Sequence, residues 1–280
     1  MKKTILFPTD FSDNSTHAAR YAGMLAKRLD ANIVVLHTYA IPITTEFQVP
    51  YDILNFEDIS KKSGDVQLGQ FVKALIHNAE LAPDSVSEKI EYGEAPAKIV
   101  EIANSIHADM IVMGTKGASN ILDRWLGTNA QSVMKNADCP VWIIPSDCEI
   151  NCPDKVVYFT DFEEDEVFAV QKVLDVVEPL GSYCQVIHIN EFLDMDSHRQ
   201  IRATVNSMKE NFQSREVYIR NIDRNDDDLI GALESYLSDS KPDVLALEIH
   251  EQSFLNRLFE PSVTNHFVFG ARLPLLTFKK

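Results

Sequence analysis

Long hydrophobic runs are absent from this sequence. Its longest apolar stretches, such as residues 33–36 and 141–144, are the size of a β-strand, whereas a membrane-spanning helix needs about 20 residues. Only residues 4–7 separate the basic start of the chain from Pro8, which is too short for the apolar region of a secretory signal. We therefore expect a cytoplasmic protein with no membrane partner.

Basic side chains are also scarce. The chain has 26 Lys and Arg against 42 Asp and Glu, a formal net charge of −16. Proteins that bind nucleic acid draw most of their affinity from clustered Lys and Arg, so we expect no nucleic-acid partner. The charge does not exclude a small anion, because backbone N–H groups at a helix N-terminus can hold one.

Cysteine is limited to four residues without the spacing of a zinc site, Cys139, Cys148, Cys152 and Cys184. We expect free thiols and no metal site. What the chain does have is length and apolar content: 280 residues, of which 45% are hydrophobic, suffice for one large domain or two ordinary ones.

The sequence contains a repeat. Residues 3–11 resemble residues 155–162 with one residue missing, and an offset of 151 carries 35–37 onto 186–188. Nearer the end an offset of 134 aligns 108–113 with 242–247, so the second copy is shorter by 17 residues, the difference of the two offsets. We attribute the shortening to residues 40–64, which we predict to be a long proline-containing loop. The predicted domains are 1–147 and 153–280.

Strand-like runs alternate with helical periodicity within each copy. In the first copy the predicted strands are 5–7, 33–37, 86–92, 110–113 and 141–144, and helices are predicted between them. This alternation indicates βαβ crossovers and a mostly parallel sheet in each domain, hence two tandem doubly wound α/β units. The polar residues that alternate in 86–92 predict a half-exposed edge strand.

Three of the ten glycines lie in the stretch GTKGASNILDRWLGTN, residues 114–129. Asp10 follows the first strand and Gly114 the fourth, and both would face one crevice if these strands flank the point where strand order reverses. Thr128 is the predicted N-cap of the next helix, and the free N–H groups of Asn129 and Ala130 would then point at a phosphate. Asp10 suits a ribose hydroxyl or a bound metal.

The glycine spacing G-x-x-G-x9-G-[ST] differs from the P-loop and from the Rossmann fingerprint. It resembles the nucleotide motif of universal stress proteins, as do the opening ILFPTDFS and the closing CPV of the first copy. The resemblance implies a Rossmann-like fold of five parallel strands in the order 3-2-1-4-5, with ATP bound by a subset of members. The nucleotide-binding residues that it implies are Thr9, Asp10, Thr38, Met113, Gly114, Lys116, Gly117, Gly127, Thr128 and Asn129.

The resemblance also implies pairing between domains, because family members pair through their last strands. In this chain Val141–Ile144 would then meet Leu275–Phe278 intramolecularly. A further homodimer is left open.

The second copy departs from the motif. With the offset of 134, the residues that align with Gly114, Gly117 and Gly127 are Glu248, Glu251 and Pro261. Carboxylates repel phosphate, and proline has no N–H to donate. We expect this copy to have kept its fold and lost its ligand. We expect His37 and His188, which follow equivalent strands, to be packed and hydrogen-bonded rather than ligands.

Two functions follow as hypotheses. The first is a stress-response module that binds ATP, or ADP or AMP, together with Mg²⁺ in its first domain. We predict no catalytic residues and at most slow ATP hydrolysis, for which Lys116 is the only cation in the glycine loop. The alternative is a scaffold that binds no nucleotide and interacts with a protein or an apolar ligand.

Overall fold

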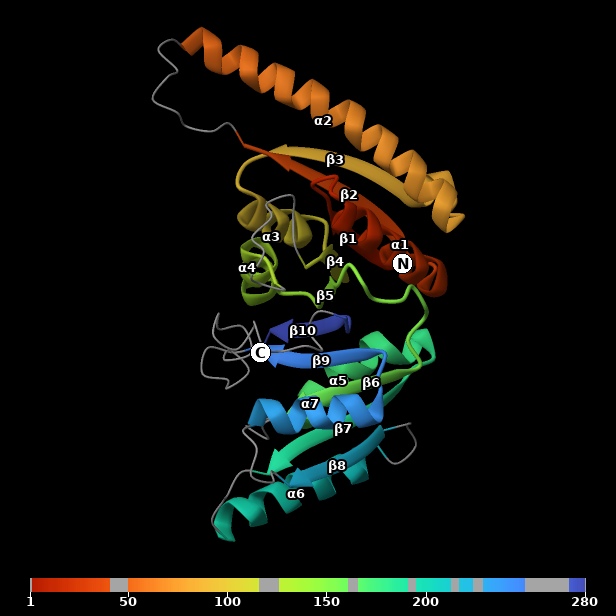
Figure 1. Ribbon diagram of the computed structural model, residues 1–280, viewed down its shortest axis with the longest axis vertical. Helices are drawn as coiled ribbons and strands as arrows, with labels where there is room; N and C mark the ends of the chain where they lie inside the picture. The colour runs from red at the N-terminus through yellow and green to blue at the C-terminus, as the bar shows by residue number, and fades with distance from the viewer. Residues whose placement is uncertain are drawn as a thin grey trace. The chain divides into compact units, whose positions relative to one another are not determined.

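The computed structural model describes residues 2–40, 50–115, 126–160, 166–190, 195–212, 217–223, 229–249 and 272–279. The chain divides into two compact units near Ser146 (Figure 1). The first comprises Met1–Leu122 and Gly127–Ser146, and the second comprises Asp147–Lys280 with Asp123–Leu126.

The first unit is an α/β unit built on five parallel strands in the order β3-β2-β1-β4-β5. The order is 3-2-1-4-5, as the family resemblance implied. Its strands are β1 (Thr4–Pro8), β2 (Asn32–Tyr39), β3 (Val86–Tyr92), β4 (Met110–Gly114) and β5 (Val141–Ile144). Its helices are α1 (Asp13–Leu29), α2 (Pro50–Ala79), α3 (Ala95–Ser105) and α4 (Thr128–Asn136), with the 3-10 turn η1 (Pro83–Ser85).

The second unit repeats this topology, with five parallel strands in the order β8-β7-β6-β9-β10. Its strands are β6 (Lys155–Thr160), β7 (Tyr183–Asn190), β8 (Val217–Asp223), β9 (Val244–Ile249) and β10 (Leu275–Lys279). Its described helices are α5 (Glu166–Val177), α6 (Met195–Asn211) and α7 (Leu229–Ser240), with the 3-10 turn η2 (Glu178–Leu180). Two tandem doubly wound units were therefore correctly predicted.

Hydrophobic burial explains the strands of both units. Ile5, Leu6 and Phe7 of β1 are all fully buried, as expected for a central strand that is covered on both faces. In β3, by contrast, no residue is fully buried, which confirms the predicted half-exposed edge. Trp142 on β5 is completely inaccessible to solvent and packs near Tyr21, with ring centroids 5.9 Å apart.

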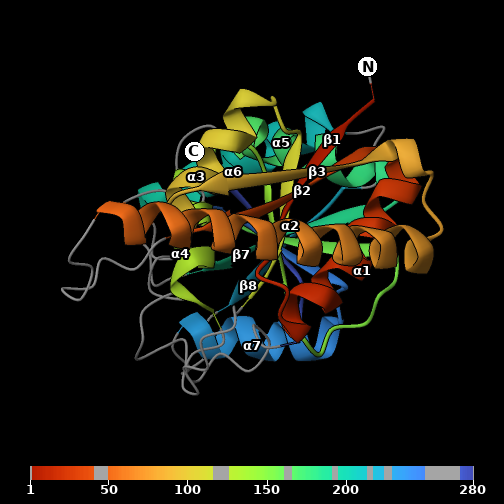
Figure 2. The ribbon, with the colours of Figure 1, turned by 90° about the horizontal axis from the view of Figure 1, so that it is seen from above.

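The predicted loop at residues 40–64 is wrong from Pro50 onward, because α2 begins there and continues to Ala79 (Figure 2). Proline is accepted in the first turn of a helix, where its missing N–H has no intrahelical partner to lose. Pro50 therefore marks a helix start. The second copy is shortened mainly in this helix: α2 has 30 residues and its counterpart α6 has 17, a difference of 13.

The predicted missing residue at the start of the second copy is also wrong. The Thr4 N–H donates to Asp109 Oδ2 at 2.7 Å, and the Lys155 N–H donates to Asp243 Oδ2 at 2.8 Å. Thr4 and Lys155 are thus equivalent, and the 151 offset holds throughout the first strand. As a result Phe159 takes the place of Pro8, since Pro8 pairs in register with Leu36 and Phe159 with Ile187.

All four cysteines are thiols outside any disulfide, as predicted. Complete burial raises the pKa of the Cys184 thiol to about 12, which keeps it protonated at neutral pH. Across the described residues, no helix is long and apolar enough to span a bilayer. That same part of the chain contains no group of three His, Cys, Asp or Glu side chains suited to a metal ion.

Candidate functional site

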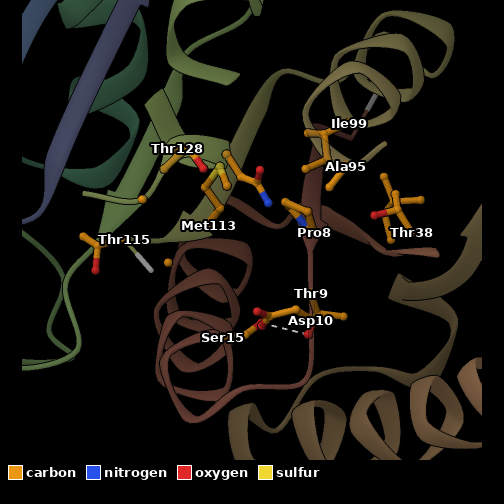
Figure 3. Close-up of a pocket in the computed structure, with 15 residues that line it drawn as sticks. Pro8, Thr9, Asp10, Ser15, Thr38, Ala95, Ile99, Met113, Thr115 and Thr128 are labelled. Carbon is orange, nitrogen blue, oxygen red and sulfur yellow. Dashed lines mark hydrogen bonds between the residues drawn. The ribbon is translucent and has the colours of Figure 1, made fainter. Parts of the chain in front are cut away.

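The switch point of the first unit lies between β2 and β4, which pair with opposite edges of β1. A cavity of about 250 Å³ lies beyond the carboxyl ends of these strands (Figure 3). This is where ligands bind in open doubly wound sheets. Eight of the ten predicted site residues line it: Thr9, Asp10, Thr38, Met113, Gly114, Gly127, Thr128 and Asn129. Lys116 and Gly117 lie outside the described residues.

The turn from β1 into α1 fixes one wall of the cavity. Asp10 is exposed, and its Oδ1 accepts hydrogen bonds from the N–H of Ser12 at 3.1 Å and from the Ser12 hydroxyl at 2.6 Å. Ser12 in turn is the N-cap of α1 and accepts from the Ser15 N–H at 3.2 Å. Phe11 between them has φ of +63°, in the left-handed region. Asp10 therefore orients the helix cap in addition to facing the cavity.

Ser15 was missed by the sequence interpretation. Its hydroxyl donates to Thr9 Oγ1 at 2.8 Å, and both side chains are buried at the base of the cavity. Thr9 Oγ1 also accepts from the Phe11 N–H at 3.0 Å. The available signal was a polar residue one turn into α1 on the same face as buried Ala18 and Ala22.

His37 holds the backbone of this wall. Its Nδ1 lies 2.9 Å from the carbonyl oxygen of Thr9, while the Thr9 N–H donates to the carbonyl of Leu36 at 2.8 Å. The imidazole packs against the Phe11 ring, with centroids 4.3 Å apart. His37 is the packed, hydrogen-bonded histidine that was predicted, and it does not line the cavity.

The opposite wall is the N-terminus of α4. Gly127, not Thr128 as predicted, is the N-cap residue. The Gly127 N–H donates to the Thr115 carbonyl at 2.6 Å, and its backbone is extended (φ −75°, ψ 157°), so the helix begins at Thr128, one residue earlier than predicted. The first intrahelical bond runs from the Gln131 N–H to the Gly127 carbonyl at 3.1 Å.

The N–H groups of the first three helical residues therefore have no intrahelical acceptor. Thr128, Asn129 and Ala130 all line the cavity. Within the described part of the chain, no carbonyl or side chain accepts a hydrogen bond from their N–H groups. Three backbone donors at the positive end of the helix dipole thus border the cavity, an arrangement that favours an anion.

The third wall is apolar. Ala95 and Ile99 lie one turn apart at the start of α3 and face the cavity together with Leu36 and Met113. The sequence predicted only that a helix lies between the strands at 86–92 and 110–113, and nothing in its spacing placed Ala95 at a ligand site. Figure 3 shows Ala95 and Ile99 across the cavity from Thr9 and Asp10.

Charge in the described lining is confined to one side chain. Asp10 is the only ionisable residue among the described residues that line the cavity, and the others carry hydroxyls, one amide and apolar groups. Any attraction of this lining for an anion must therefore come from backbone N–H groups and the helix dipole.

A doubly wound parallel sheet with a cavity at its switch point and a helix N-terminus on its rim defines the class of Rossmann-like α/β proteins. The sequence model of the Universal stress protein family matches residues 1–145, about half of the chain. This chain belongs to the universal stress protein family.

Similar proteins agree with this assignment. A universal stress protein of Methanocaldococcus jannaschii is 32% identical over 146 residues, which cover 51% of this chain and 81% of that protein. The crystal structure of a universal stress protein from Archaeoglobus fulgidus covers 99% of this chain and 98% of its own, with a TM-score of 0.71 and 18% identity. It shows that the fold extends over both units.

A further structure is a universal stress protein in complex with cAMP, 25% identical over 52% of this chain and 98% of that protein. Its TM-score of 0.39 is too low to support a structural comparison.

Proposed function

We propose that the first unit binds ATP and that the protein acts as a nucleotide-binding module of the stress response. The observation that carries this proposal is the row of three backbone N–H groups, at Thr128, Asn129 and Ala130, that border the switch-point cavity. Phosphates bind readily to such helix N-termini.

The remaining walls suit the other parts of the nucleotide. The apolar side chains of Ala95 and Ile99 provide a surface for the adenine ring, with the backbone at Thr38 as its hydrogen-bonding partner. Asp10 suits the ribose hydroxyls, and Gly114 leaves room for the phosphates to approach β4. The cavity, at about 250 Å³, is close to the lower limit of roughly 300 Å³ for ligand pockets. Lys116 and Gly117 are proposed to contribute on the evidence of the motif alone.

The site also fits a Mg²⁺ ion that enters with the triphosphate. Mg²⁺ is held by phosphate oxygens and one or two carboxylates, and Asp10 is the carboxylate that the described lining offers. The ion would supply the positive charge that these side chains do not. The residues of this chain would orient the nucleotide, and the three N–H groups would neutralise part of the phosphate charge.

We propose binding rather than efficient turnover. The described lining contains hydroxyls and one carboxylate, whose Oδ1 already accepts two hydrogen bonds from Ser12. ATP hydrolysis, which depends mainly on positioning and charge stabilisation, would be slow. ADP or AMP can occupy the same cavity. The pairing of Val141–Ile144 with Leu275–Phe278, like a homodimer, stays a prediction.

The test is the nucleotide content of the freshly purified protein, followed by an ATP titration of the wild type and of Gly127→Val. The extended backbone of Gly127 is open to a β-branched residue, so the variant should fold while its side chain fills the phosphate position. We expect about one nucleotide per wild-type chain and an affinity at least about 100-fold lower in the variant, a loss of about 2.7 kcal/mol.

Unchanged affinity in folded Gly127→Val would contradict the site. A wild type that neither carries nor binds nucleotide would instead favour the scaffold hypothesis.

A further inference from the structure

Two buried hydroxyl groups lie together at the base of the cavity in the first unit. Thr9 and Ser15 line this cavity and are only 7% and 5% exposed. Figure 3 shows both side chains near Asp10, with a dashed line between their hydroxyl oxygens, which are 2.8 Å apart. Buried hydroxyl groups are normally hydrogen-bonded, so the partner of each of the two hydroxyl protons can be sought in the structure.

The Thr9 hydroxyl is left as a donor only. A hydroxyl group has one proton to donate and two lone pairs that accept. Thr9 Oγ1 accepts from the Phe11 N–H at 3.0 Å and from the Ser15 hydroxyl at 2.8 Å, and among the described residues no group accepts the Thr9 proton. Reversing the bond between the two hydroxyls would leave the spare proton on Ser15 instead. In either direction the pair keeps one proton to donate to a ligand.

This hydroxyl pair is particular to the first unit. With the offset of 151, the residues that align with Thr9 and Ser15 are Thr160 and Glu166, so the threonine is retained and the serine is not. Both residues of the second unit are buried, and β6 is still followed by α5. The fold therefore forms without a serine at this position, which points to a role for the Ser15 hydroxyl in the cavity.

The neighbouring Asp10 limits the ligand group that can use this donor. The Asp10 side chain is exposed and lines the same cavity, and an ionised carboxylate only accepts hydrogen bonds. An anionic ligand oxygen in direct contact with it would be repelled. A hydroxyl group suits both neighbours, because its oxygen accepts from Thr9 while its proton is donated to Asp10. Phosphate has separate donors at the N-terminus of α4.

We propose that Thr9 and Ser15 together select a ligand with sugar hydroxyls. Ser15 is a positioning residue, because its hydroxyl occupies a lone pair of Thr9 Oγ1 and so keeps the Thr9 proton directed at the ligand. A ribose hydroxyl accepts that proton and donates its own to Asp10. The inference rests on the proposed nucleotide binding and adds that the site discriminates ribonucleotides from nucleotides that lack the sugar hydroxyls.

The experiment is a calorimetric titration of the full chain with ATP and with 2′,3′-dideoxy-ATP, which keeps the base and the triphosphate. We expect the wild type to bind ATP about 30-fold more tightly, since both Thr9 and Asp10 lose a partner in the analogue. Thr9→Val keeps the shape of the side chain without its hydroxyl, and it should weaken ATP about tenfold and the analogue less than about twofold.

Two further variants test the hydroxyl pair itself. Thr9→Ser restores the hydroxyl and should recover most of the ATP affinity that Thr9→Val loses. Ser15→Ala removes the group that orients the Thr9 proton, and it should weaken ATP about threefold and reduce the preference over the analogue by the same factor. This variant keeps the inference testable if Thr9→Val does not fold.

The matched control is Thr16→Val, which removes a hydroxyl from the same turn of α1. Thr16 Oγ1 donates to the Ser12 carbonyl at 3.0 Å and does not line the cavity, so both affinities should stay at wild-type values. Circular dichroism should show each variant folded. ATP binding without a preference over the analogue, or an equal loss for both nucleotides in Thr9→Val or Ser15→Ala, would overturn this inference alone. A wild type that binds neither nucleotide would overturn the proposed function as well.

Discussion

At the carboxyl end of the fourth strand the first unit has Gly114 and the second has Glu248. Gly114 lines an open cavity. The Glu248 carboxylate instead lies 3.2 Å from the ammonium of Lys172 on α5, which also donates to the Lys279 carbonyl at 3.1 Å and lies over the Phe168 ring. The 151 offset places Lys172 at the position of Tyr21. The second unit thus fills this position with the Glu248 carboxylate and pairs it with Lys172, whereas the first unit has an open cavity at Gly114.

Other positions of the cavity also carry larger or acidic residues in the second unit. Ser15 is replaced by Glu166, Pro8 by Phe159 and, in the 134 register, Thr115 by Ile249. All three replacements are buried. Small or hydroxyl-bearing groups have become large apolar or acidic ones, and each change opposes a phosphate-bearing ligand through volume or charge.

The contacts that the two units share have a different character. His37 Nδ1 lies 2.9 Å from the Thr9 carbonyl oxygen, and His188 Nδ1 lies 3.0 Å from that of Thr160. Because this contact persists where the cavity residues have changed, it belongs to the fold. The comparison therefore separates residues that hold the sheet together, present in both units, from the cavity residues that we propose to serve a ligand, present in one.

The largest effect is expected when the acidic residue of the second unit is introduced at the equivalent position of the first unit. Gly114→Glu places a carboxylate in the cavity, and Tyr21 offers no cation to neutralise it. We expect ATP affinity to fall at least about 100-fold, because the carboxylate adds both bulk and repulsion. The measurement is an ATP titration, with Gln70→Glu on the exposed face of α2 as a control for added charge. Retained affinity in a folded Gly114→Glu protein would show that β4 does not border the ligand.

A second variant tests the internal ion pair. Lys172→Ala leaves Glu248, whose side chain is only 14% exposed, without its ammonium partner. We expect a loss of about 1–3 kcal/mol in the stability of the second unit, the cost of an unsatisfied buried group. Hydrogen exchange of the β9 and β10 amides measures it.

The matched control for that variant is the double substitution Lys172→Ala/Glu248→Ala. It should lose less than the sum of the two single substitutions if the groups are coupled. Strict additivity would mean that the pair contributes nothing to stability.

The smallest expected effects come from a glycine pair that tests the packing of the long helix. An added Cβ at Gly23 of α1 would lie 2.5 Å from the Ala79 Cβ of α2, whereas at Gly69 its nearest neighbour is Glu88 Oε2 at 3.9 Å. Gly23→Ala should destabilise the first unit by about 1 kcal/mol through overpacking. Gly69→Ala should stabilise it by about 0.5–1 kcal/mol through helix propensity. Urea unfolding measures the change in stability of each variant. Changes of the same sign would contradict the close α1–α2 contact. In α5 the equivalent of Gly23 is Leu174, so this close approach is particular to the first unit.

The sequence alone determined the fold class, the repeat and most of the candidate site. Apolar runs separated by helical periodicity predict parallel strands because burial on both faces requires them. The glycine motif and Asp10 pointed to residues that do line one cavity. Their spacing along the chain constrains the local turns, and parallel strands bring their carboxyl ends to one edge of the sheet.

Only the tertiary structure decided the rest. Ser15, Ala95 and Ile99 border the cavity because α1 and α3 approach it from different parts of the chain, and no local pattern records that approach. Pro50 could be assigned to a helix or a loop from composition, since proline is compatible with both. The register of β6 was shown by the hydrogen bonds that Asp109 and Asp243 accept from the N–H groups of Thr4 and Lys155, which lie 105 and 88 residues away in the sequence. The sequence dictates local conformation through short-range sterics and hydrophobic periodicity, whereas contacts between distant segments depend on how the folded elements pack.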